Sequence, residues 1–190
     1  MPSNNNASNV SAAQPNIAGA IYYGPTSTSL PTTADETLAA GFTCLGYISE
    51  DGITNSNTRE SDTFKAWGGD TVLTSQTSYS DTFNFKLLEV LNKDVLKTVF
   101  GAANVSGDLA TGLTVNANSK ELGSFAWVID MVMRDDALNR IVIPNGKISE
   151  VGDITYASSD LTAYDVTVTA FPDSNSNTHY EYKKAAPVVS

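Results

Sequence analysis

The sequence has one cysteine, no long apolar run and few basic residues. With Cys44 as its only cysteine, the chain cannot form an internal disulfide or a zinc site built from several thiolates. No apolar stretch approaches the roughly 20 residues that a transmembrane helix needs. Residues 1–16 lack both the basic start and the apolar segment of a secretory signal peptide. We therefore expect the chain to stay in the cytoplasm in which it is made.

Acids outnumber bases, with 21 Asp and Glu against 11 Lys and Arg, for a formal net charge of −10. The acids are spread along the chain from Asp35 onward rather than gathered in one block. A DNA-binding protein uses Lys and Arg to displace the counterions of the phosphates. The charge therefore argues against a specific DNA-binding protein.

Catalytic and cofactor-binding motifs are also missing. His179 is the only histidine, and neither a nucleophile-elbow nor a phosphate-loop motif occurs. A calcium loop starting at Asp51 fails because Ser56 stands where such a loop needs glycine. We therefore expect no catalytic site, no cofactor and no metal. A hydrolase that uses dispersed carboxylates stays an alternative, with these candidates: Glu50, Asp51, Glu121 and Glu150.

Most of the chain after residue 80 has the pattern of half-buried β-strands. Apolar and polar residues alternate with period two over 81–90, 123–133 and 161–171. Asp135 and Asp136 indicate a turn, and Asn145-Gly146 is a strong hairpin signal because both residue types tolerate positive φ. We predict an antiparallel meander over about 122–171.

One segment has helical spacing instead. In residues 91–101 a stripe of apolar residues recurs every three to four positions, with Asn92 as a plausible N-cap and Gly101 as a stop. The predicted fold is mainly β: an antiparallel β-sandwich or barrel with one short flanking α-helix at about 91–100.

The ends and one internal segment differ from this β domain. We expect an extended N-terminal arm at 1–16, a β-sandwich domain at 17–172 and a C-terminal tail at 173–190, in which only YEYKK has the pattern of a strand. Residues 49–63, SEDGITNSNTRESDT, are too long and polar for a tight turn, and they predict a long loop that is mobile in the free chain.

Three separate runs of the sequence, in the expected order, resemble the major tail protein, or tail tube protein, of long-tailed bacteriophages with non-contractile tails. The runs are GAIYYGPTSTSLPTTADETLAAGFTCLGYISEDGITNSN, KAWGGDTVLTSQTSYSDTFNFKLLEVLNKDVLKTVFG and RIVIPNGKISEVGDITYASSDLTAYDVTVTAFPD. They cover most of the chain from Gly19 to about Phe171.

The resemblance implies a structural virion protein without cofactor. Its copies would close into hexameric rings, and the rings would stack into the hollow tail tube through which DNA is ejected into the host. Implied partners are further copies of the chain and other tail proteins such as the tape measure and the terminator. The expected location is the virion tail, after assembly in the host cytoplasm, with no membrane involved.

Two groups of residues are candidates for these roles. An acidic lining would keep DNA phosphates from binding to the bore, and Asp130 and Asp165, each on the polar face of an expected strand, are candidates for it together with Asp153. The 49–63 loop would contact the next ring, pairing with Arg59, Arg134 or Arg140 of a neighbouring copy. Its candidate contact residues are Glu50, Asp51, Asn55, Asn57, Arg59, Glu60 and Asp62.

A second function stays open. A soluble β-sandwich binding module would hold polysaccharide or a host surface by stacking sugar rings on aromatic side chains. The candidate aromatic residues for that role are Tyr47, Trp67, Tyr156 and Tyr180.

Overall fold

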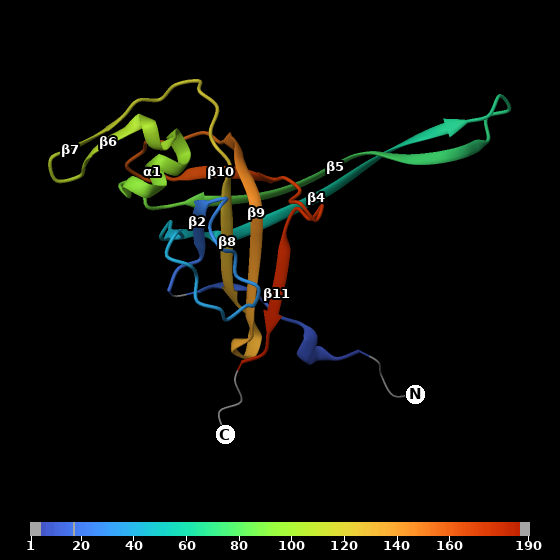
Figure 1. The fold of residues 1–190 in the computed structure, drawn as a ribbon, viewed down its shortest axis with the longest axis horizontal. Helices are drawn as coiled ribbons and strands as arrows, with labels where there is room; N and C mark the ends of the chain where they lie inside the picture. Colours follow the sequence, from blue (N-terminus) through green and yellow to red (C-terminus); the bar gives the residue numbers. More distant parts are fainter. Residues whose placement is uncertain (1–4, 17, 187–190) are drawn as a thin grey trace.

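The computed structural model describes residues 5–16 and 18–186 (Figure 1). A nine-stranded antiparallel sheet forms the body, and a separate two-stranded hairpin and one α-helix lie beside it within the described residues. The strands are β1 (Gln14–Pro15), β2 (Ile21–Pro25), β3 (Thr43–Cys44), β4 (Ile48–Lys65), β5 (Thr71–Leu87), β6 (Val105–Asp108), β7 (Gly112–Val115), β8 (Phe125–Val132), β9 (Leu138–Val151), β10 (Tyr164–Ala170) and β11 (Tyr180–Lys184). The helix α1 spans Lys93–Phe100, and short 3-10 turns span Ala7–Asn9, Ala102–Asn104 and Arg134–Asp136.

The sheet folds into two layers that share the long strand β9. The first half of β9 pairs with β8 on one side and with β11 on the other, and its second half pairs with β10. In Figure 1, β8, β9 and β11 run crosswise to β10, β5 and β4. The predicted antiparallel β-sandwich and the β8–β9–β10 meander are confirmed.

The core lies where these layers meet. Its central side chains are fully or almost fully buried: Phe83, Phe85, Leu87, Trp127, Ile129, Ile143, Val166 and Val168. On β10 the buried and half-exposed residues alternate as predicted. On β8 both faces are buried, because Ala126 and Val128 are as inaccessible as Trp127. The prediction of a polar, solvent-facing side for this strand is therefore wrong.

The predicted helix is confirmed within two residues of its start. The Asn92 side chain accepts a hydrogen bond from the backbone N–H of Asp94, which satisfies a free donor of the first turn. Gly101 ends the helix with a φ of 92°, a conformation that costs a residue with a Cβ more than it costs glycine. The buried stripe Val95, Leu96 and Val99 packs into the core cluster.

The hairpin predicted at Asn145-Gly146 is wrong, because both residues lie within the continuous strand β9. Gly146 faces Trp127, whose indole N–H donates to the Gly146 carbonyl at 3.1 Å. A Cβ at Gly146 would lie 2.7 Å from the indole ring. Close approach of the large aromatic ring, and not a turn, explains the glycine.

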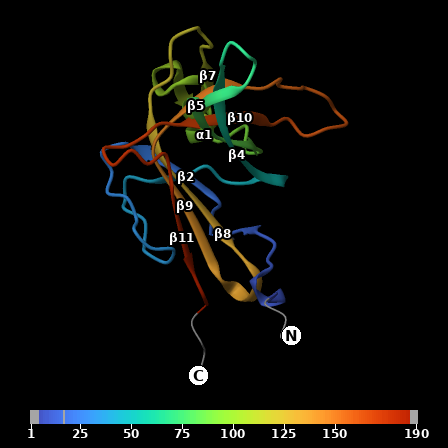
Figure 2. The same ribbon diagram turned by 90° about the vertical axis from the view of Figure 1, so that its right-hand side faces the viewer.

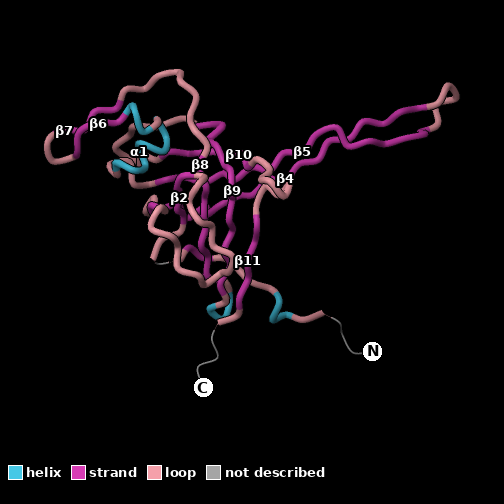
Figure 3. The backbone as a smooth tube through the Cα atoms, viewed as in Figure 1, coloured by secondary structure: helices cyan, strands magenta, loops and turns pink. Residues whose placement is uncertain are grey.

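Residues 49–63 are not a loop, and that prediction is also wrong. They form most of β4, which pairs with β5 from Ile53 to Lys65, with register shifts after Glu60 and after Phe64. The resulting hairpin extends far from the body (Figures 1 and 3). Viewed from the side of its tip, the body lies behind it (Figure 2). Because both faces of the outer hairpin are exposed, no apolar alternation marked these residues as strand.

Both terminal segments pack on their own chain in part. β1 pairs with the end of β8, and β11 pairs with β9, which confirms YEYKK as a strand. In addition, the Arg134 guanidinium donates to the Ala7 carbonyl at 3.2 Å. Contacts of the two arms with neighbouring copies stay a prediction, and residues 1–4 and 187–190 lie outside the described residues.

Candidate assembly site

The most prominent surface is the projecting hairpin, residues 54–80, in which every residue of β4 and β5 is exposed. Its two strands are held by their backbone ladder and by cross-strand side-chain contacts. Asn57 donates to the Tyr79 hydroxyl at 2.7 Å, and the Arg59 guanidinium lies 4.7 Å from the centre of the Tyr79 ring. Ser78 donates to Glu60 at 2.8 Å. These contacts stiffen the hairpin without covering it.

The end of the hairpin is apolar. Phe64 and Leu73 are cross-strand partners that are 53% and 57% exposed. Trp67 in the turn is fully exposed, and Val72 is mostly so. We call Phe64, Trp67, Val72 and Leu73 the apolar tip. Since the described residues leave these large side chains uncovered, the tip has the character of a surface that contacts another protein.

The sequence also contains a signal for the turn at the tip, which the alternation of apolar residues does not reveal. Gly68-Gly69 stands between two apolar segments, which is a signature of a hairpin turn. Gly69 has a φ of 94°, and its N–H donates to the Ala66 carbonyl. The glycine pair alone could have located the turn, although the polar strand that adjoins it has the composition of a loop.

At the root of the hairpin lies a buried carboxylate that we call the root clamp. Asp81 is 1% exposed and accepts hydrogen bonds from Asn55 at 2.8 Å and from the Thr178 hydroxyl at 2.6 Å. Nδ1 of His179 lies 2.6 Å from the same carboxylate. The clamp therefore ties both hairpin strands to the segment that precedes β11, at the point where the hairpin leaves the body.

Replacing Asp81 by Ala is expected to lower the free energy of unfolding by about 2–3 kcal/mol, because the buried Thr178 hydroxyl, together with Asn55, loses its acceptor. Hydrogen exchange should rise in residues 54–58 and 76–80, where the hairpin joins the body. Ser78→Ala, which removes one exposed hydrogen bond of the same hairpin, is the matched control and should leave both measurements close to wild type. Equal exchange in the two variants would contradict a clamp at Asp81.

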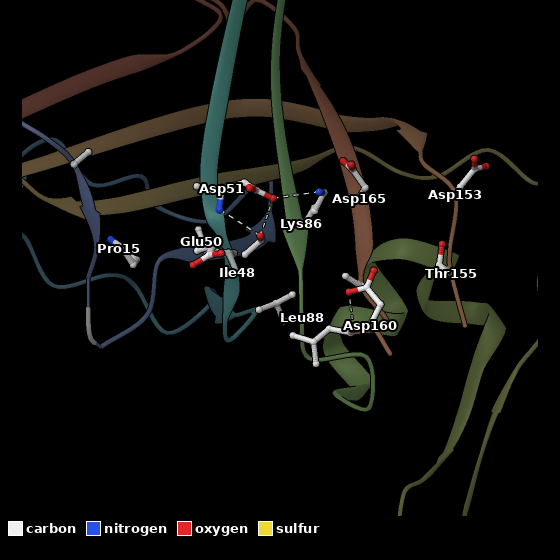
Figure 4. Close-up of a pocket in the computed structure, with 15 residues that line it drawn as sticks. Pro15, Ile48, Glu50, Asp51, Lys86, Leu88, Asp153, Thr155, Asp160 and Asp165 are labelled. Carbon is white, nitrogen blue, oxygen red and sulfur yellow. Dashed lines mark hydrogen bonds and ion pairs between the residues drawn. The ribbon is translucent and has the colours of Figure 1, made fainter. Parts of the chain in front are cut away.

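An acidic groove lies at the other end of β4. The β4–β5 ladder is irregular between Ile48 and Ile53, and Glu50 and Asp51, which lie in that interval, are exposed. The groove has a volume of about 970 Å³ and is lined by five carboxylates and one ammonium group (Figure 4). These charged residues are Glu50, Asp51, Lys86, Asp153, Asp160 and Asp165.

Among the described charged residues of the groove, Asp51 and Lys86 form the one ion pair. The Ser49 hydroxyl and then Lys86, 3.2 Å away, hold the pKa of Asp51 below its usual range. Asp51 raises the pKa of Lys86 in return, and Asp165 and Asp160 act in the same direction. Asp165 also accepts a hydrogen bond from Asn84 at 2.7 Å. With one cation against five anions, the groove has a net acidic surface.

The structure brings together residues that the sequence assigned to two different roles. Asp153 and Asp165, predicted for the lumen, line the same groove as Glu50 and Asp51, predicted for the contact between rings. Asn55 belongs to the root clamp, while Asn57, Arg59 and Glu60 make contacts within the hairpin. Asp62 faces Ser75 across the ladder. Whether any of these residues touches another copy stays a prediction.

Asp130 does not belong to this surface, and its predicted place in a lumen lining is wrong. It is 7% exposed, and its two carboxylate oxygens accept from Nε and Nη2 of Arg140 at 2.6 and 2.8 Å. Arg140 is 6% exposed and also donates to the carbonyls of Thr33 and Glu36. This buried pair fastens the 26–42 segment to β9, so Arg140 is also not free to pair with a neighbouring copy.

The described residues show neither a metal-binding cluster nor a membrane-spanning helix. They contain no group of three or more His, Cys, Asp or Glu side chains placed to hold a metal ion. None of their helices is long and apolar enough to cross a membrane.

A β-sandwich from which a stiff hairpin with an apolar tip projects is the architecture of a structural subunit that assembles with other protein chains. The family described as Phage tail tube protein matches residues 1–187, and the chain belongs to that family. A search among curated proteins finds no match. The family places the chain in the tail of the virion as a structural component of the tail tube.

Proposed function

We propose that this chain polymerises as stacked hexameric rings and that the resulting tube is a negatively lined conduit for DNA ejection into the host. The observation that supports this most strongly is the projecting hairpin, whose apolar tip is left uncovered by its own chain. The four large apolar side chains do not stabilise the free subunit while they are exposed to water. Burial of these side chains against a neighbouring copy would stabilise the assembly.

The sheet edge supports closure into a ring. β4 is the last strand of the sheet path and pairs only with β5 among the described strands, so one side of its backbone is open to a further strand. Addition of a neighbour's strand at such an edge satisfies the free N–H and C=O groups. Head-to-tail repetition of that contact closes a ring when the rotation between copies is a fraction of a full turn.

The acidic groove supports the passage of DNA without binding. If the face that carries Asp153 and Asp165 lines the bore, phosphates meet carboxylates rather than the cations that would retain them. The tape measure and terminator proteins of the tail are the further partners that we propose, and the tube would be completed in the host cytoplasm.

Negative-stain electron microscopy of the concentrated, purified protein tests the assembly. We expect tubes whose end views average with sixfold symmetry. A protein that stays monomeric at every concentration and binds polysaccharide would support the binding-module alternative instead. Rings of another order would refute the hexamer but not the tube.

The lumen assignment makes a separate prediction. The double variant Asp153→Lys and Asp165→Lys should still form tubes but retain short DNA, with binding that weakens steeply as salt is raised. We expect affinity at least about tenfold above that of wild-type tubes. Asp108→Lys, which reverses an exposed charge on the β6–β7 hairpin, is the control and should not retain DNA. DNA binding by neither variant would count against a lumen at the acidic groove.

A further inference from the structure

A small cavity lies beside the start of β4. It has a volume of about 400 Å³ and lies between residues 15–16 and 18–20, the end of β3 and the segment that follows β5. We call it the socket; its lining includes Ala18, Ala20, Cys44, Tyr47, Ile48 and Glu89. The Tyr47 ring is mostly exposed next to it. The lining is thus largely small or apolar, with one carboxylate.

The socket and the apolar tip lie at opposite ends of the same strand. Ile48, the first residue of β4, lines the socket, and Lys65, the last, adjoins the tip. The strand has 18 residues, which at about 3.3 Å per residue separates the two ends by roughly 55–60 Å. The hairpin also points away from the body (Figure 1). A tip therefore cannot reach the socket of its own chain, but it can reach that of another copy.

The chemistry of the two surfaces is complementary. A cavity of this size accommodates an indole ring, and an aromatic side chain buries about 150–250 Å² in such a site. Glu89 is half-buried and, among the described residues, has no ion-pair partner. Lys65, next to the tip, is likewise unpaired within the described part of the chain. The carboxylate keeps free acceptor positions, since it takes one hydrogen bond from the Tyr47 N–H and one from Asn92.

We propose that the apolar tip of one copy docks in the socket of the next copy, with Trp67 in the cavity and Lys65 near Glu89. This inference rests on the proposed assembly into a tube and adds the receptor for the hairpin. Because donor and receptor are different surfaces at the two ends of one strand, the contact is heterologous. A bound pair of copies still has one free tip and one free socket, so the contact propagates through the tube and does not stop at a dimer.

The single native cysteine provides a direct test. Gly68 at the tip has an ordinary φ and open space where a Cβ would lie, so Gly68→Cys keeps Trp67 and is tolerated by the fold. Mild oxidation of tubes formed by this variant should join the new thiol to Cys44 of the next copy. Denaturing gels without reductant should then show a ladder of covalent oligomers. Cys44→Ser in the same background should abolish the ladder, and Leu109→Cys, on the exposed β6–β7 turn, should give none.

A second variant blocks the socket from the receptor side. Ala18 is exposed at its rim, so Ala18→Trp should leave the unfolding transition unchanged while raising the concentration needed for tubes at least about tenfold. Ala110→Trp adds the same ring to the β6–β7 turn and is the matched control.

The outcomes separate this inference from the proposed function. A ladder that depends on Cys44, together with impaired assembly of Ala18→Trp, supports the socket. Tubes that form normally in Ala18→Trp and give no ladder in Gly68→Cys overturn the socket but leave the tube intact. A wild-type chain that never forms tubes overturns both.

Discussion

Replacing Phe64, Trp67 and Leu73 together by serine is expected to abolish tube formation at concentrations where the wild type assembles. Each of these side chains is at least half exposed in the subunit, so its burial is gained only on assembly. Full burial of a large apolar side chain is worth about 1.5–3 kcal/mol. Each loss of roughly 1.4 kcal/mol weakens an association constant about tenfold. The three losses together therefore weaken association by several factors of ten. We expect the critical concentration to rise by about a hundredfold or more.

Sedimentation and electron microscopy across a concentration series measure this effect. The same substitutions should not change thermal unfolding of the subunit, because they remove no contact within the body. Leu91→Ser and Leu109→Ser, two exposed apolar residues outside the hairpin, form the matched control and should assemble like the wild type. Equal critical concentrations for the tip variant and this control would refute the role of the tip.

The contrast between the two ends of β5 explains which strands the sequence predicts. In residues 81–87 one face is buried and the other is half-exposed or exposed, so apolar residues alternate with polar ones and the pattern predicts a strand. In residues 71–80 both faces of the strand are exposed to solvent. The sequence there is mainly polar, so its composition resembles that of a loop. The hairpin is stabilised by backbone hydrogen bonds between its strands. Such bonds do not require apolar and polar side chains to alternate, so the sequence shows no period of two. The candidate inter-ring residues lie on the hairpin or at its base, but their strand conformation was not predicted, and their contact with another ring stays a prediction.

Contacts between distant residues explain the other differences. The alternation around Asp130 correctly places it on the face opposite Trp127, yet nothing local indicates that Arg140 lies beside it on the next strand. Similarly, Asn145-Gly146 satisfies the local rule for a turn, while the need for space around Trp127 is set by packing between β8 and β9. The grouping of Asp51, Asp153 and Asp165 in one groove depends on the same long-range pairing.

Arg140→Met is expected to be the most destabilising single substitution that we predict. Removing one partner of a buried ion pair costs about 3–5 kcal/mol, because the other charge stays buried and uncompensated. Here the variant leaves the Asp130 carboxylate without its two donors and leaves the Thr33 and Glu36 carbonyls without a partner from β9. For a domain of this size we expect the midpoint of thermal unfolding to fall by about 10 °C.

A double variant tests the physical cause. In Arg140→Met with Asp130→Leu no charge is left in the low-dielectric site, so stability should recover in part relative to Arg140→Met alone, despite the second substitution. Lys86→Met, which removes the cation of the exposed Asp51 pair, should change stability little because solvent screens that pair. Denaturant unfolding measures the stability of all three variants.

Hydrogen exchange should show residues 33–36 exposed in Arg140→Met, since the Thr33 and Glu36 carbonyls anchor the 26–42 segment. A double variant less stable than Arg140→Met would show that packing around the arginine, and not its charge, holds this segment in place.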